Sequence, residues 1–159
     1  MFHLLPAVVM CPFVIRDYIA DRQNWFITGL AGGLMGIGFV FYGLGLVVAS
    51  VTKTTVLFYL TPVWATLFAY IFLSELFGFG RWLAIIGGIT GCLLVMRVNP
   101  LDFGYDNADL LGLMSGMAWA AGSVVIRRYP NAYFVHITFM QYLVGGLLAG
   151  GAALFMGDA

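Results

Sequence analysis

The charged residues of this chain are confined to a few short islands, and the stretches between them carry no charge. A membrane-spanning helix needs about 20 predominantly apolar residues, and four of the uncharged runs reach or approach that length. Such helices form all their backbone hydrogen bonds internally, which is required where the bilayer offers no water. The pattern therefore predicts a polytopic membrane protein with these uncharged runs: 1–15, 23–52, 54–74, 82–96, 110–126 and 129–157.

Composition agrees with this class and excludes others. The chain is 62% hydrophobic and 9% charged, whereas a soluble domain is about 45–50% apolar. Its net charge is zero, and Arg127 and Arg128 form its one basic pair, so no electrostatic footprint for nucleic acid is present. Cys11 and Cys92 fall inside apolar runs and are interpreted as packing residues. Neither a Ser/His/Asp set nor an HExxH or CxxC motif occurs, so we expect no enzyme, no cofactor and no metal.

The expected fold class is all-α, because the runs are solidly apolar instead of alternating with period two. The first run, which starts at once, is interpreted as the remainder of a clipped span. Turn-forming residues between the fourth and fifth spans indicate a linker, 99–108, that separates residues 1–98 from residues 109–159. About six transmembrane helices are predicted: 1–15, 25–49, 55–74, 82–97, 109–126 and 134–156.

The orientation follows from the basic residues in the connections. Connections after the first, third and fifth spans hold five of them, whereas those after the second and fourth hold only Lys53 and Arg97. The five-residue set is therefore predicted to be cytoplasmic, and the linker is predicted to be external. The cytoplasmic set is Arg16, Arg22, Arg81, Arg127 and Arg128.

Most of the 21 glycines lie inside the apolar runs. At about 100° per residue, four glycines of the second span share one face. Small residues let membrane helices approach closely, so these faces are predicted to pack helices, and sliding between moving helices is the functional alternative. The residues are Gly29, Gly33, Gly36 and Gly43, together with the pairs Gly87/Gly91, Gly112/Gly116, Ala118/Gly122 and Gly146/Gly150.

The third span carries a polar stripe around a proline. Thr55, Tyr59, Thr66 and Tyr70 fall within about 60° of one another on an ideal helix. Pro62 has no N–H, so it frees a preceding carbonyl and kinks the axis. Broken helices at membrane depth are tolerated where they line a cavity. Plain kinking and hydroxyl bonding within the helix are the structural alternative.

Other spans offer further candidates for a cavity. Ser115 and Trp119 lie on one face of the fifth span with Gly112 and Gly122, and an indole in mid-span needs a partner for its N–H. Tyr42 on the second span could add a hydroxyl. Glu75 ends the third span near Arg81 and is a candidate cytoplasmic gate, with a surface ion pair or a helix boundary as the alternative.

Residues 43–96 look like the last three spans of an EamA domain of the drug/metabolite transporter superfamily. The features that resemble it are the small-residue end GLGLVVAS, the central Pro62, the Ser74-Glu75 ending and the glycine-rich AIIGGITGCLLVM. Residues 109–128, with Trp119 followed by small residues, resemble the opening span of a second EamA repeat. The resemblance implies ten spans in two inverted five-span repeats, of which this chain would hold about six, from part of span two to span seven.

The resemblance also implies transport of small metabolites across the bacterial inner membrane, often as efflux, and it places pocket residues beside the proline, which adds Thr61. We expect a secondary transporter of amino-acid-like or drug-like amphipathic solutes that works by alternating access. A non-transporting membrane scaffold or assembly subunit is the alternative. The expected partners are the lipid bilayer, a small solute, and either further spans of the same protein or a second copy. The predicted cavity lining is Tyr42, Tyr59, Thr61, Thr66, Ser115 and Trp119.

Overall fold

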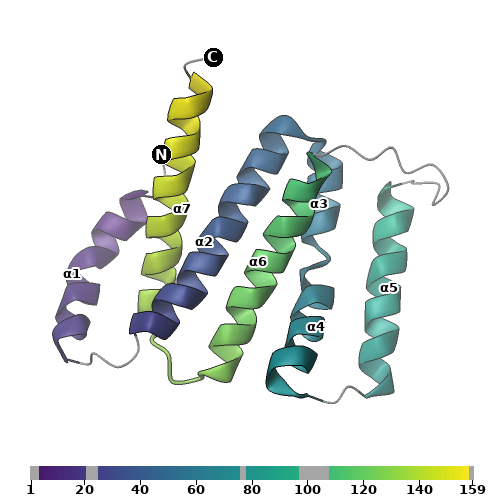
Figure 1. The fold of residues 1–159 in the computed structure, drawn as a ribbon, viewed down its shortest axis with the longest axis horizontal. Helices are drawn as coiled ribbons and strands as arrows, with labels where there is room; N and C mark the ends of the chain where they lie inside the picture. Colours follow the sequence, from purple (N-terminus) through teal and green to yellow (C-terminus); the bar gives the residue numbers. More distant parts are fainter. Residues whose placement is uncertain (1–3, 21–24, 76–77, 97–107, 158–159) are drawn as a thin grey trace.

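The computed structural model describes residues 4–20, 25–75, 78–96 and 108–157 (Figure 1). All secondary-structure elements in this part of the chain are helices, which confirms the all-α class. The elements are α1 (Leu4–Ala20), α2 (Trp25–Val48), α3 (Val51–Phe58), α4 (Thr61–Leu73), α5 (Phe79–Met96), α6 (Asp109–Arg128) and α7 (Phe134–Gly157). Of the predicted linker 99–108, only Ala108 lies within the described residues.

The helices confirm a polytopic membrane protein. By length and composition, four segments can cross a membrane, with α3 and α4 together forming one of them: Trp25–Val48, Val51–Leu73, Asp109–Arg128 and Phe134–Leu154. Two shorter apolar stretches, Leu4–Arg16 and Phe79–Leu94, belong to α1 and α5. Most predicted span ends agree within a few residues. The first helix differs, because it continues through Arg16 as far as Ala20.

The helices stand side by side in a layer whose order differs from their order in the chain (Figure 1). Across the layer the order is α1, α7, α2, α6, the α3–α4 pair and α5. Helix α6 therefore lies between α2 and the α3–α4 pair, although it follows both in sequence. Segments on either side of the linker thus pack into one structure.

Glycine permits the close contacts within this layer. On α2, Gly32 and Gly36 lie against α7, and Gly38 lies against α6, where an added Cβ would be 2.9 Å from the carbonyl oxygen of Ser115. On α6, the predicted pair Gly112/Gly116 packs against α3 and the start of α4. That pair is confirmed as a packing surface.

The predicted glycine face of the second span is wrong as a whole. Of its members, only Gly36 is closely packed, and a Cβ added at Gly29, Gly33 or Gly43 would meet no described atom within 4 Å. The faces in contact are offset around the helix, because α2 has two neighbours, α6 and α7, that approach from different directions. Gly87/Gly91 on α5 and Gly150 on α7 likewise have no described neighbour within that distance.

The ends of α2 and α3 are tied together by a buried threonine. Thr54 has no exposed surface, and its hydroxyl donates to the carbonyl oxygen of Gly45 at 3.1 Å. Its Cα and carbonyl also face Gly112 of α6. Helices α2, α3 and α6 therefore meet closely at this end of the layer.

Candidate functional site

The third span breaks between Phe58 and Thr61, where α3 ends and α4 begins. An ideal helix would use the N–H of residue 62 to satisfy the carbonyl of Phe58, but Pro62 has none. The Thr61 hydroxyl donates to that carbonyl instead. Backbone hydrogen bonding resumes at Val63, whose N–H donates to the carbonyl of Leu60 at 2.9 Å. The predicted interruption and the freed Phe58 carbonyl are both confirmed.

Four aromatic side chains from three elements gather at this break. We call Phe39, Tyr42, Phe58 and Trp119 the aromatic cluster. Phe58 is central, with its ring centroid 4.9 Å from that of Tyr42 and 6.1 Å from that of Trp119, the latter in an edge-to-face arrangement. Phe39 lies 6.5 Å from Trp119. Such arrangements match the electrostatic preferences of aromatic rings.

Hydroxyl groups border the cluster. The Tyr42 hydroxyl and Thr55 Oγ1 are 3.3 Å apart and form a hydrogen bond between α2 and α3. Thr61 stands on the α6 side of the break, because its Oγ1 would lie 3.3 Å from a Cβ added at Gly116. The cluster therefore combines apolar ring surface with hydroxyl groups at its edge. It contains no ionisable carboxylate, amine or imidazole.

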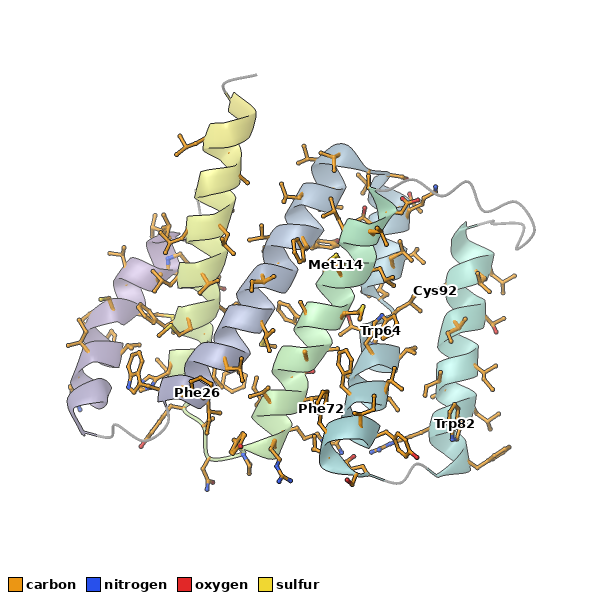
Figure 2. The ribbon with its side chains drawn as sticks, viewed as in Figure 1. Phe26, Trp64, Phe72, Trp82, Cys92 and Met114 are labelled. Carbon is orange, nitrogen blue, oxygen red and sulfur yellow. The ribbon has the colours of Figure 1, made fainter. Side chains whose placement is uncertain are left out.

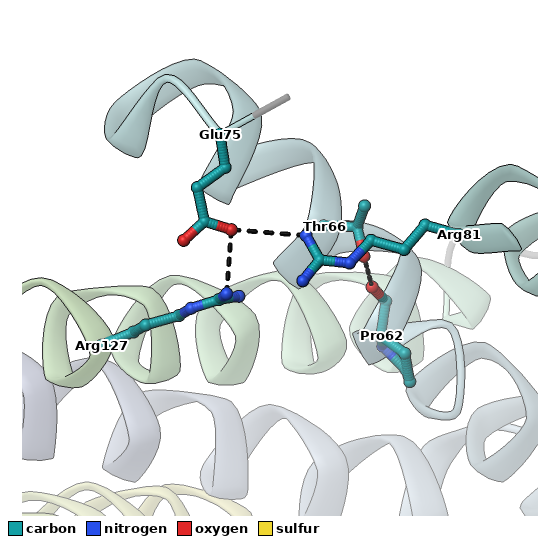
Figure 3. Close-up of polar contacts among 5 residues, drawn as sticks. All are labelled: Pro62, Thr66, Glu75, Arg81 and Arg127. Carbon is teal, nitrogen blue, oxygen red and sulfur yellow. Dashed lines mark hydrogen bonds and ion pairs between the residues drawn. The ribbon is translucent and has the colours of Figure 1, made fainter. Parts of the chain in front are cut away.

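Tyr59 and Thr66 lie beside the cluster rather than inside it. Tyr59 is 67% exposed, and its ring centroid is 6.2 Å from that of Phe58. With Pro62 and Thr66, it lines a groove of about 230 Å³ between the broken helix and α5. The Thr66 hydroxyl donates to the carbonyl of Pro62 at 2.8 Å (Figure 3).

Ser115 occupies a different environment from the other predicted lining residues. It has no exposed surface, and its hydroxyl donates to the carbonyl of Gly112 at 2.6 Å. Its backbone faces Gly38 of α2. Ser115 thus lies in the interface between α2 and α6, next to the turn of helix that carries Trp119.

An ion-pair network joins α4, α5 and α6 at one end of the layer. Glu75 Oε2 lies 2.9 Å from Arg127 and 3.3 Å from Arg81, and Figure 3 shows it between the two guanidinium groups. Ser74 positions this carboxylate, because its left-handed backbone (φ 55°, ψ 32°) ends α4 and turns the chain. The sequence indicated the Arg81 pair but gave no signal for Arg127.

A second ion pair joins α3 to α6 at the opposite end of the layer. Lys53 Nζ at the start of α3 lies 3.1 Å from Asp109 Oδ2 in the first turn of α6. The broken helix is therefore fastened to α6 by ion pairs at both ends. The Lys53–Asp109 pair was not predicted, because nothing local in a sequence pairs residues 56 positions apart.

The described residues contain no group of three or more His, Cys, Asp or Glu side chains placed to hold a metal ion. What the site offers is aromatic surface, hydroxyl groups and a helix break within apolar spans. These features define the class: a polytopic helical membrane protein with a neutral, aromatic, hydroxyl-bordered site.

The chain belongs to the EamA-like transporter family, whose model matches residues 1–97. Its relatives include an S-adenosylmethionine uptake transporter of Rickettsia bellii, 28% identical over 77% of this chain and 42% of the relative. A riboflavin transporter of Rhizobium johnstonii is 29% identical over 79% of this chain and 41% of the relative. A riboflavin transporter of Vibrio cholerae is 24% identical over 81% and 44%.

The chain spans less than half the length of these curated relatives. No solved structure matches it.

Proposed function

We propose that this protein is a secondary transporter that moves a small amphipathic metabolite across the bacterial inner membrane by alternating access. The observation that carries the proposal is the aromatic cluster at the break between α3 and α4, in a chain of the EamA-like transporter family. A broken helix presents backbone and side-chain polar groups at membrane depth, which is useful where a solute passes.

The chemistry of the cluster favours a solute with a flat aromatic ring. Phe58 and Trp119 can stack against such a ring, while Tyr42 and Thr55 can exchange hydrogen bonds with its polar edge. S-adenosylmethionine and riboflavin, the solutes in the relatives' names, both contain a planar heteroaromatic ring. Because one of these relatives is named for uptake, the outward direction expected from the resemblance stays a prediction.

The two ion-paired ends of the broken helix suit alternating access. In both ion pairs, Glu75–Arg127 and Lys53–Asp109, each side chain is partly exposed. Solvent screening limits the more exposed Glu75–Arg127 pair to about 0–1 kcal/mol, so a conformational cycle can break it. We propose that Glu75 with Arg127 closes the cytoplasmic end and that Lys53 with Asp109 closes the external end. Each pair would open when its own side opens.

The proposal is tested by measuring uptake and efflux of radiolabelled S-adenosylmethionine, riboflavin and an aliphatic amino acid in cells that express the protein. Trp119→Ala should slow transport of the ring-containing solute by up to about tenfold, the equivalent of one lost aromatic contact. Leu110→Ala is the matched control, because it shortens a side chain nine residues away, on the opposite side of α6.

Both variants should reach the membrane at the parental level. Equal transport by Trp119→Ala and the parent would show that the aromatic cluster does not contact the solute. A change in abundance with no change in transport per molecule would favour the scaffold.

A further inference from the structure

A second groove opens on the other face of the layer. Trp119 and Arg128 are nine residues apart on α6, which places their side chains roughly 180° apart around the helix. Arg128 is part of the second groove, which has a volume of about 320 Å³ and is walled by α2 and α4 with α6 as its floor. The groove is therefore separate from the aromatic cluster, and no step of the proposed transport uses it.

The lining of this groove is almost entirely apolar. Phe26 and Leu30 contribute from α2, Phe68 and Phe72 from α4, and Ala121 from α6. Figure 2 shows Phe26 and Phe72 on the two helices that flank α6. Phe26 is 80% exposed and Phe72 is 69% exposed. A solute with many polar groups would find few hydrogen-bond partners here, whereas a hydrocarbon chain would find a continuous apolar surface.

A guanidinium group stands at one end of the groove. Arg128 is the last residue of α6, at the end of the layer that the positive-inside rule assigns to the cytoplasm. Its neighbour Arg127 is already paired with Glu75, which also binds Arg81. Arg81 and Arg127 share the single carboxylate of Glu75, and Arg128 adds a further positive charge beside this network.

We propose that this groove binds an anionic phospholipid, with an acyl chain between α2 and α4 and the phosphate on Arg128. Basic pockets between membrane helices on the cytoplasmic side bind anionic headgroups, and the guanidinium group suits a phosphate through paired N–H donors. The groove, of about 320 Å³, lies between α2 and α4 over α6, and its lining is almost entirely apolar. Part of the length of an acyl chain therefore fits in the groove.

The test is native mass spectrometry of the protein extracted from vesicles of equal parts dioleoyl phosphatidylglycerol and dioleoyl phosphatidylcholine. The parent protein should retain phosphatidylglycerol in preference to phosphatidylcholine. Arg128→Gln should reduce that retention about fivefold, which corresponds to the roughly 1 kcal/mol of a basic residue near an anionic surface. Arg128→Lys should keep most of it. Arg127→Gln removes the same charge from a side chain about 100° further round α6, which pairs with Glu75 and does not line the groove, and this variant should retain the lipid.

Three results would overturn the proposal. The first is equal retention of the two lipids by the parent, and the second is an Arg128→Gln variant that retains as much phosphatidylglycerol as the parent. The third is displacement of the lipid by millimolar glycerol 3-phosphate, which would assign Arg128 to a soluble phosphate. Ala121→Phe, which fills the apolar part of the groove, should lower retention of both lipids. Because no transport is measured, failure here leaves the proposed function untouched.

Discussion

Replacement of Gly38 by alanine should loosen the packing of α2 on α6, whereas the same replacement at Gly33 should not. A Cβ at Gly38 would lie 2.9 Å from the carbonyl oxygen of Ser115 and 3.1 Å from the backbone nitrogen of Trp119. Both atoms belong to a helix backbone, so neither can move without shifting α6. A Cβ at Gly33 would meet no described atom within 4 Å.

The two variants can be compared because they share one helix. Alanine favours the helix by up to about 1 kcal/mol over glycine in both, so this gain cancels in the difference. What remains is the cost of overpacking at Gly38, typically about 1–3 kcal/mol. At roughly 2–4 °C per kcal/mol for a chain of this size, the midpoints should differ by roughly 2–12 °C.

Thermal unfolding in detergent micelles, followed by circular dichroism, measures this difference. Gly38→Ala should unfold at the lower temperature, and Gly33→Ala should unfold at or above the parental temperature. Two variants with equal midpoints would show that α2 and α6 do not approach as closely as described. A less stable Gly33→Ala would show that the free side of α2 is covered.

Three further predictions concern the helix break, the end of α4 and the topology. Thr61→Val should cost about 1–3 kcal/mol in unfolding experiments, because the carbonyl of Phe58 loses its hydroxyl donor; unchanged stability would contradict that role. Ser74→Val should destabilise the protein by about 1–2 kcal/mol and Ser74→Gly should not, since a β-branched residue disfavours a positive φ; thermal midpoints in reverse order would refute it. In a background without native cysteines, an impermeant thiol reagent applied to intact cells should label Thr52→Cys and spare Gly78→Cys; the opposite pattern would invert the orientation.

The spans and the helix break were predictable because both depend on local properties of the chain. Uncharged length marks the membrane segments, and a proline inside such a segment removes one backbone donor wherever the helix goes. The break at Phe58 and Thr61 therefore followed from Pro62 alone. Thr55 was predicted as part of the polar stripe, whereas Thr61 was added only by the resemblance to the EamA family.

The neighbours of each helix could not be predicted in the same way. Helical periodicity groups Gly29, Gly33 and Gly43 as readily as Gly38 and Gly45, but only the latter two contact α6 or α3. Which side of α2 is covered depends on α6 and α7, which come from the other side of the linker. For the same reason the sequence placed Ser115 in a cavity lining, although the approach of α2 leaves it no exposed surface.

Alternating access is tested most directly by fixing the end of the layer that Lys53 and Asp109 hold together. Cysteines at these two positions, in a background lacking Cys11 and Cys92, can be joined by a short cleavable thiol cross-linker. We predict that cross-linking stops transport in both directions and that reductive cleavage restores it, while the same reagent leaves the transport rate of each single-cysteine variant unchanged. Transport that continues at the parental rate in fully cross-linked protein would contradict the account.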